Sequence, residues 1–274
     1  MSGGFPPGGG EAGWELRRGF DNVPELYDRV RPAYPPELFD TLFSLLPPEP
    51  EIVEVGPGTG KATSDLLERG ARVTGVELGD GLATFLERKL GGNERLRVVR
   101  ATFEEADLTP GAFDAVVAFT AYHWVQPPAR LDKPARILRR SAILAVVDTN
   151  QVVSGVDGGY FESVQPIYRR YDRDSPELKQ SSEEDPRPSI VDELGSSPLY
   201  EDVRLHKYRW DQRYSRAEYG DLLRSYSGSQ AMPEGEREAM IGELCEVIDR
   251  DHGGWLTRPL VVTLTVARRA AGAA

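Results

Sequence analysis

The chain has 274 residues, a net charge of −11 and a single cysteine, Cys245. This length can bury a full core, and the acidic balance argues against nucleic acid or an anionic membrane as the main partner, because phosphate binding needs a cationic surface. One cysteine cannot form an intrachain disulfide, which suits a reducing compartment. No apolar run approaches the roughly twenty residues of a spanning helix, so a soluble, cytoplasmic protein without a membrane partner is expected.

The N-terminal region is predicted to contain a tail followed by helical segments. Residues 1–13 are rich in glycine and proline, include no apolar stretch typical of a signal peptide, and are expected to be disordered. Residues 14–274 are expected to form one domain. From about residue 20 to residue 46 the pattern is helical but interrupted by prolines, with Leu38, Leu42 and Leu45 at helical spacing.

The most informative stretch reads Glu-Ile-Val-Glu-Val-Gly-Pro-Gly-Thr-Gly-Lys, from Glu51 to Lys61. Its β-branched start predicts a buried parallel strand, and a helical pattern begins at Lys61. The glycines between them allow positive φ angles and let a ligand approach the backbone closely. The N–H groups at the start of the next helix would bind an acceptor. The stretch predicts a cofactor loop; an ordinary glycine turn is the simpler alternative.

The spacing of this loop distinguishes between cofactor classes. A dinucleotide fingerprint counted from Gly56 requires glycine at position 61, where this chain has Lys61. The second predicted strand, residues 71–77, ends in Glu77, a carboxylate that can accept hydrogen bonds from both hydroxyls of a ribose. Glu54 follows an apolar run and needs a partner to offset its desolvation, such as a cofactor ammonium group or a nearby arginine.

The rest of the chain continues the alternation of strands and helices. Further strands are predicted at 96–100, 113–119, 142–148, 203–211 and 259–267, and helices at 128–140, 160–171, 215–226 and 235–251. Ser215 and Glu218 have the spacing of a capping box, and the polar stretch 172–188 predicts a loop or linker. Because ligands bind at the carboxyl ends of the strands of an open α/β sheet, the residues after 119 are expected beside a ligand.

These residues together resemble a known family. Glu54-Val-Gly-Pro-Gly-Thr-Gly60, followed by Val76-Glu77, is similar to motif I and the acidic loop of the class I S-adenosylmethionine-dependent methyltransferases. Phe103-Glu104-Glu105, Phe113-Asp114 and Ala121-Tyr122-His123-Trp124 resemble the small-molecule branch that includes trans-aconitate methyltransferase-like proteins. The resemblance covers residues 25–150 well and the remainder more loosely.

The resemblance implies a fold. It implies a Rossmann-like α/β architecture, a doubly wound seven-stranded sheet whose last strand is antiparallel. A helical cap would lie over the acceptor site, built from an N-terminal part at about residues 20–46 and an inserted segment at about residues 150–200.

The resemblance also implies a cofactor site. Its residues would be Tyr27, Arg31, Glu54, Gly56, Gly58, Thr59, Gly60, Glu77, Leu78, Thr102, Phe103, Glu104 and Phe119. Tyr27 would face the sulfonium and Arg31 would pair with the cofactor carboxylate, although both residues fit an exposed amphipathic helix equally well. Many relatives have an acid where this chain has Ala101, so the adenine contact is expected at Thr102, Phe103 or Glu104.

The acceptor is expected to bind after the fourth strand, at Tyr122, His123 and Trp124. His123 is the candidate catalytic base for a hydroxyl or an amine, whereas a carboxylate acceptor needs no base. Alternatively, His123 and its aromatic neighbours are packed core residues. Arg169, Arg170 and Arg173 could bind an acidic acceptor, but a solvated helix face is the favoured interpretation.

The expected function is that of an enzyme of small-molecule metabolism. It would transfer a methyl group from S-adenosylmethionine to a small organic acceptor, with a carboxylate or hydroxyl oxygen as the expected atom. Displacement at a sulfonium suits a dry pocket and needs no metal, and the three histidines of the chain lack metal-ligand spacing. A protein that binds the cofactor without turnover, or a nicotinamide-dependent oxidoreductase, which Lys61 disfavours, are the alternatives. The acceptor and the oligomeric state are left open.

Overall fold

The computed structural model describes residues 24–171, 181–182 and 190–272. The tail at residues 1–13 lies outside the described residues, as does most of the polar stretch 172–188. Within the part that is described, every helix is too short or too polar to span a bilayer.

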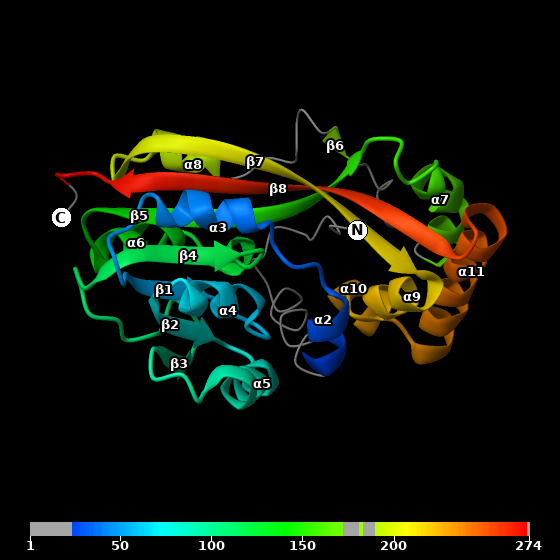
Figure 1. The fold of residues 1–274 in the computed structure, drawn as a ribbon, viewed down its shortest axis with the longest axis horizontal. Helices are drawn as coiled ribbons and strands as arrows, with labels where there is room; N and C mark the ends of the chain where they lie inside the picture. The colour runs from blue at the N-terminus through cyan, green and yellow to red at the C-terminus, as the bar shows by residue number, and fades with distance from the viewer. Residues whose placement is uncertain (1–23, 172–180, 183–189, 273–274) are drawn as a thin grey trace.

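A central sheet organises the molecule, and its main path runs β3-β2-β1-β4-β5-β8-β7 (Figure 1). The strands are β1 (Glu51–Val55), β2 (Arg72–Glu77), β3 (Leu96–Arg100), β4 (Phe113–Phe119), β5 (Leu138–Val153), β7 (Tyr200–Ser215) and β8 (Trp255–Arg269), with the short β6 (Ser181–Ser182) beside β5. The first five strands pair in parallel, and β8 is antiparallel to both β5 and β7. The expected Rossmann-like topology with an antiparallel last strand is confirmed.

The parallel strands are apolar on both faces because helices cover both sides of the sheet. In β4, Val116 and Ala118 face one core, while Ala115 and Val117 face the other. The first core includes residues of α6 (Ala129–Ile137) and α8 (Val191–Ser196), and the second includes residues of α3 (Pro36–Phe43) and α4 (Lys61–Glu68). Helix α5 (Asp80–Leu90) packs along β2 and β3. The outcome is a three-layered body.

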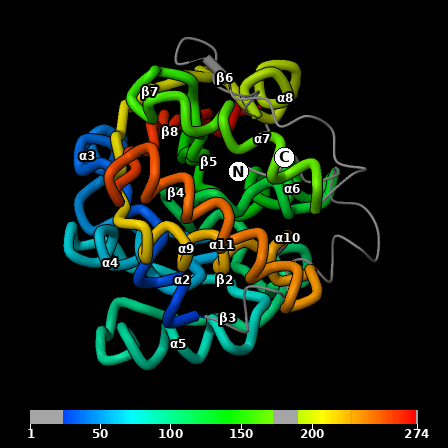
Figure 2. Tube along the Cα trace, turned by 90° about the vertical axis from the view of Figure 1, so that its right-hand side faces the viewer, coloured from blue at the N-terminus to red at the C-terminus, as the bar shows by residue number. Residues whose placement is uncertain are grey.

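A third core lies beyond the carboxyl ends of the parallel strands, at the right of Figure 1. Its elements are α2 (Pro24–Val30), α7 (Tyr160–Tyr171), α9 (Arg216–Arg224), α10 (Ser227–Gln230), α11 (Glu234–His252) and the adjoining ends of β7 and β8. We call this assembly the cap. Figure 2 looks at the molecule from this side, with α9 and α11 lying across the ends of the strands.

The cap differs in composition from the one expected. Its larger part comes from residues after 200 rather than from about 150–200, and α3 does not belong to it. Leu38, Phe39 and Leu42 of α3 are fully buried against the sheet with Leu66 of α4, so the apolar pattern near residue 40 belongs to the core of the sheet. Of the two helices described before β1, α2 packs in the cap and α3 does not.

Helix α2 joins the cap to the body of the sheet. Asp28 pairs with Lys89 of α5 at 2.8 Å, and Arg29 pairs with Asp221 of α9 at 2.9 Å. Exposed ion pairs contribute little stability individually. These two pairs nevertheless show that α2 contacts α5 of the body on one side and α9 of the cap on the other.

Candidate functional site

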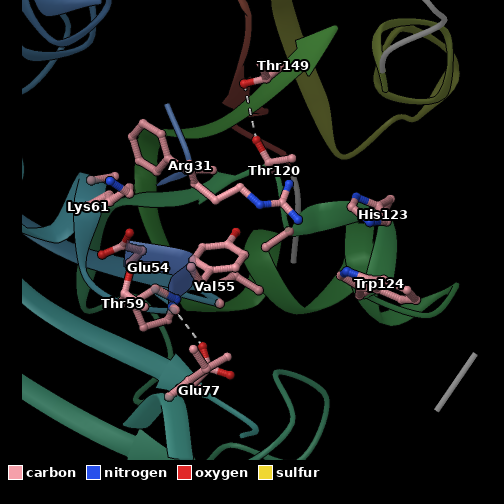
Figure 3. A pocket seen from close by; sticks show the side chains of 18 of the residues that line it. Arg31, Glu54, Val55, Thr59, Lys61, Glu77, Thr120, His123, Trp124 and Thr149 are labelled. Carbon is pink, nitrogen blue, oxygen red and sulfur yellow. Dashed lines mark hydrogen bonds between the residues drawn. The ribbon is translucent and has the colours of Figure 1, made fainter. Parts of the chain in front are cut away.

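A cavity of about 570 Å³ lies where the parallel strands end and the cap begins. The loops that follow β1, β2, β3 and β4 and residues 148–151 of β5 line one side, and residues of α2, β7, β8 and the α9–α10 connection line the other. Figure 3 shows Glu54 and Lys61 on one side of this space and His123 and Trp124 on the opposite side. The cavity therefore sits at the sheet edge that the topology favours for a ligand.

The glycine loop after β1 approaches the cavity with its backbone. Gly56 has a φ of 64°, and a Cβ atom at this position would lie 2.8 Å from the Cβ of Ala121. Its N–H donates to the carbonyl of Val76 at 2.9 Å, which fixes the loop to the end of β2. Any residue other than glycine at position 56 would therefore be strained by the positive φ angle and would clash with Ala121.

Glu77 connects two of the loops that line the cavity. Its Oε2 accepts a hydrogen bond from the Gly58 N–H at 2.9 Å, and its Oε1 accepts one from the Gly79 N–H at 3.0 Å (Figure 3). The residue is only 6% exposed. A carboxylate held by two backbone donors has a fixed orientation and keeps further lone pairs for a ligand.

Glu54 is a buried carboxylate at the floor of the cavity. It is 1% exposed and accepts a hydrogen bond from Thr63 Oγ1 at 2.6 Å. Burial raises the pKa of Glu54 to about 7, although the bond from Thr63 acts in the opposite direction. Such a group favours a cationic partner that restores its charged form.

Two further groups of the glycine loop are available to a ligand. Thr59 is 1% exposed and its Oγ1 lacks a hydrogen-bond partner, although the residue lines the cavity. Burial lowers the pKa of Lys61, the first residue of α4. With the buried Glu54, these groups give this end of the cavity a hydroxyl, an acid and a base, which suits a ligand that carries both an ammonium and a carboxylate group.

Three hydroxyl groups line the cavity near the ends of β4 and β5. Tyr34 Oη lies 3.3 Å from Thr120 Oγ1, which lies 3.5 Å from Thr149 Oγ1 (Figure 3). Thr120 has a φ of 56°, an uncommon and strained angle for a β-branched residue. Strained backbone of this kind is concentrated at functional sites, which agrees with its position in the cavity.

Most of the residues expected in the site line this cavity. They are Tyr27, Arg31, Glu54, Gly56, Gly58, Thr59, Glu77, Leu78, Thr102, Phe103, Glu104, Phe119, His123 and Trp124. Gly60 does not line the cavity. It is the N-cap residue of α4 and packs against α5, where a Cβ atom would lie 2.6 Å from Leu86 Cδ1. Tyr122 is also placed differently, because its ring is buried in the core and its hydroxyl donates to the carbonyl of Arg130.

Tyr27 and Arg31 contact each other within the cavity. The Arg31 guanidinium lies 4.8 Å from the centroid of the Tyr27 ring and 4.2 Å from that of Tyr226. Its Nε donates to Ser225 Oγ at 3.1 Å and its Nη2 to the Ser225 carbonyl at 3.1 Å. Arg31 is therefore held in place from the cap side and is not an exposed residue of an isolated helix.

The residues after β3 differ in their burial. Phe103 is 4% exposed and packs in the core, with Lys133 Nζ 5.3 Å from its ring centroid. Glu104 Oε1 accepts a hydrogen bond from the Gln126 N–H at 2.7 Å, which ties this loop to the one after β4. Thr102 Oγ1 donates to Glu105 at 3.0 Å.

His123 is exposed at the surface of the cavity, and its ring lies 4.8 Å from that of Trp124. The alternative of a histidine packed in the core therefore does not describe this structure. Arg170, considered above for an acidic acceptor, instead pairs with Glu243 of α11, and Arg173 lies outside the described residues.

Sequence reasoning missed the part of the cavity formed by β5 and the cap. These residues are Asp148, Thr149, Asn150, Gln151, Tyr214, Tyr226, Arg258 and Leu260. Burial raises the pKa of Asp148 to about 6. The strand-end rule that located His123 after β4 applies equally to residues 148–151, at and just beyond the end of the fifth strand predicted at 142–148. No comparable signal marks Tyr226 or Arg258, which only the folding of the cap brings here.

Comparison with known proteins agrees with this geometry. Residues 53–146 match the family described as "Methyltransferase domain". Uncharacterised methyltransferases of Mycobacterium bovis and Mycobacterium tuberculosis are 33% identical to this chain over 133 residues, which are 48% of this chain and 53% of each relative. The chain thus spans about half the length of the curated relatives it matches.

Solved structures share the fold at low sequence identity. A protein of Anaeromyxobacter dehalogenans, assigned as a type II methyltransferase, aligns with a TM-score of 0.56 and 23% identity, covering 88% of this chain and 97% of its own. The Haemonchus contortus phosphoethanolamine N-methyltransferase 2, in complex with S-adenosylmethionine, aligns with a TM-score of 0.54 and 13% identity, covering 97% of this chain and 61% of its own. Residues 53–146 of this chain are therefore similar to a methyltransferase domain, and the chain has the Rossmann-like fold of the solved methyltransferase structures.

Proposed function

We propose that this protein transfers a methyl group from S-adenosylmethionine to an oxygen atom of a small organic acceptor. The observation that carries the proposal is a cavity that joins the glycine loop and Glu77 to the residues after β4, to residues 148–151 of β5 and to the cap. When bound, S-adenosylmethionine supplies a methyl group activated by a positively charged sulfur. Glu77 would hold the ribose hydroxyls, and Glu54 and Arg31 the ammonium and carboxylate groups.

The cap would exclude water and position the acceptor. Tyr34, Thr120 and Thr149 present hydroxyl groups to the cavity, and His123 lies at its surface. His123 would remove the proton of an acceptor hydroxyl, whereas an acceptor carboxylate would need only alignment. Enclosure by the cap favours a small molecule over a nucleic acid, in agreement with the net charge of −11.

The direct test is a transfer assay. The protein is incubated with S-adenosylmethionine carrying a labelled methyl group and a panel of small hydroxy compounds, carboxylic acids and amines. Labelled oxygen-methylated product, formed together with S-adenosylhomocysteine, supports the proposal, and exclusive labelling of amines would overturn the assignment to oxygen. Binding of S-adenosylmethionine with no product across the panel would favour a non-catalytic binding protein.

A further inference from the structure

A series of contacts crosses the cap side of the cavity and ends at Arg31. It begins at Arg258, near the start of β8, a residue that is 5% exposed. Arg258 Nη1 donates to Tyr226 Oη at 2.7 Å, and its Nη2 donates to Oε1 of Gln151 on β5. The guanidinium is thereby tied on one side to the sheet and on the other to Tyr226, in the connection between α9 and α10.

Tyr226 extends this series of contacts to α2. The Arg31 guanidinium lies over the Tyr226 ring, with its Cζ atom 4.2 Å from the ring centroid. An aromatic ring stabilises a guanidinium that lies over its face, so the orientation of the ring matters. Because Arg258 holds the hydroxyl of Tyr226, the surface on which Arg31 rests depends on Arg258.

Ser225, the neighbour of Tyr226 in sequence, holds Arg31 by hydrogen bonds. Arg31 Nε donates to Ser225 Oγ at 3.1 Å, and Arg31 Nη2 donates to the Ser225 carbonyl at 3.1 Å. Ser225 is 1% exposed, and its own hydroxyl donates to the carbonyl of Leu222 at 2.6 Å, so it is itself held in place. Within the described part of the chain, Arg31 Nη1 and one N–H of its Nη2 are left for a ligand.

The same contacts bring two positive charges to one tyrosine. Arg258 and Arg31 both contact Tyr226, and none of the ion pairs among the described residues includes either arginine. Although burial opposes it, the charges of Arg258 and Arg31 lower the pKa of Tyr226. Arg31 lines the cavity, and Figure 3 shows its side chain reaching into it. A negative group that met Arg31 here would be stabilised by both guanidinium groups.

We propose that Arg258 is a positioning residue for the carboxylate group of the cofactor. It holds Tyr226 by the hydroxyl, and Tyr226 and Ser225 together hold Arg31, whose remaining N–H groups bind the carboxylate as a planar fork. This inference rests on the proposed function and deepens it, because recognition of the amino-acid end of S-adenosylmethionine then depends on β8 and the cap as well as on α2. Arg258 acts through Arg31 rather than on the carboxylate itself.

The test compares two ligands that differ only in the carboxylate group, S-adenosylhomocysteine and its decarboxylated analogue S-adenosyl-3-thiopropylamine. Each is titrated into the full-length protein by calorimetry. We expect Arg258→Gln to weaken S-adenosylhomocysteine by roughly 10-fold and to change the affinity for the analogue by less than about twofold. A residue that merely stabilised the fold or the shape of the cavity would affect both ligands alike.

Two further variants test the route through Tyr226 and Arg31. Tyr226→Phe keeps the ring under Arg31 but removes the hydroxyl that Arg258 holds, so it should produce the same selective loss as Arg258→Gln. Adding Arg258→Gln to Arg31→Gln should change the affinity for S-adenosylhomocysteine by less than about twofold, because the two residues act as one unit and their effects are not additive.

Matched controls are available for both substitutions. Tyr208→Phe removes a hydroxyl that donates to Thr41 Oγ1 at 2.7 Å outside the cavity. Arg213→Gln changes an arginine that is exposed on β7 and stacks on Trp255, also outside the cavity. Both control variants should bind the two ligands with wild-type affinity.

Three results would overturn the positioning role. They are equal weakening of both ligands in Arg258→Gln, unchanged affinity for S-adenosylhomocysteine in that variant, or additive losses in the double variant with Arg31→Gln. If Arg258→Gln does not fold, Arg258→Lys and Tyr226→Phe replace it, and an unchanged ratio of the two affinities in both variants rejects the proposal.

Failure of this role is distinguishable from failure of the proposed function. If the wild-type protein binds neither ligand, the proposed function fails and the positioning role fails with it. If the wild type prefers S-adenosylhomocysteine to the analogue and Arg258→Gln keeps that preference, only the positioning role is rejected. A wild type that binds both ligands equally would reject the carboxylate contact of Arg31, and therefore the role of Arg258 as well.

Discussion

Glu54 illustrates how one buried residue links stability to the ligand. Its pKa of about 7 exceeds the ordinary value of 4.5, so the folded protein binds a proton more readily than the unfolded chain between these pH values. The free energy of unfolding should therefore fall as pH rises through this window, by a total on the order of 3 kcal/mol.

The first prediction concerns this pH dependence. Urea unfolding of wild-type protein and of Glu54→Gln should show a downward slope in the wild type between pH 6 and pH 8 that is largely absent in the variant. Below about pH 6 both proteins should keep the slope that comes from Asp148, whose pKa burial raises to about 6. Glu68→Gln, at an exposed position on α4, is the control and should keep the wild-type slope. Parallel curves for Glu54→Gln and wild type would show that Glu54 does not titrate in this range.

The second prediction concerns His123. If it acts as the base for an acceptor hydroxyl, His123→Ala should lower kcat by about 100-fold or more. The affinity for S-adenosylhomocysteine should change by less than about twofold, because cofactor contacts remain. His206→Ala, on β7 outside the cavity, should have wild-type turnover. Unchanged turnover in His123→Ala would contradict the role of His123 as the base, and it would favour an acceptor that is already an anion, such as a carboxylate.

At the scale of elements, the glycine loop depends on both backbone angle and space. Gly56 and Gly58 have similar φ angles, 64° and 57°, but a Cβ atom at Gly56 would meet Ala121, whereas nothing lies within 4 Å of one at Gly58. Gly58→Ala should lower the free energy of unfolding by about 1–2 kcal/mol through the φ angle alone. Gly56→Ala should cost about 1–3 kcal/mol more through overpacking. Urea unfolding measures both, and equal losses would contradict the packing argument.

The short strands were predictable from the sequence because apolar and β-branched residues dominate them. The ranges 96–100 and 113–119 agree with β3 and β4, and the expected capping box of Ser215 and Glu218 is confirmed at α9. β5, β7 and β8 are longer than their predicted ranges. Their outer parts are held by pairing with one another, and β7 alternates between exposed and partly buried positions, so a continuous apolar run does not mark their ends.

The candidate site was predictable only where its residues lie close together in the sequence. Glu54, Gly58 and Glu77 follow one another within a single strand-helix-strand unit, so their spacing alone relates them to a nucleoside. Arg258 reaches the cavity through the pairing of β8 with β5 and the packing of the cap. Contacts between segments about a hundred residues apart, such as Arg258 with Gln151, leave no local pattern.

At the scale of the whole molecule, the cavity lies between the sheet and the cap, so a ligand that contacts both should stabilise the entire fold. A ligand bound only to the folded state adds about 2.7 kcal/mol to the free energy of unfolding at a concentration of one hundred times its Kd. The central claim is that this ligand is a sulfur-bearing nucleoside whose ribose is held by Glu77.

Calorimetric titration of S-adenosylhomocysteine tests this claim most directly. We predict saturable binding to the wild-type protein, a loss of affinity of roughly 10- to 100-fold in Glu77→Gln, and wild-type affinity in Glu87→Gln. Glu87 lies on α5, where its carboxylate pairs with Arg100 of β3 outside the cavity. Absence of binding to the wild type, equal affinity in Glu77→Gln, or displacement of the ligand by NADH would contradict the account.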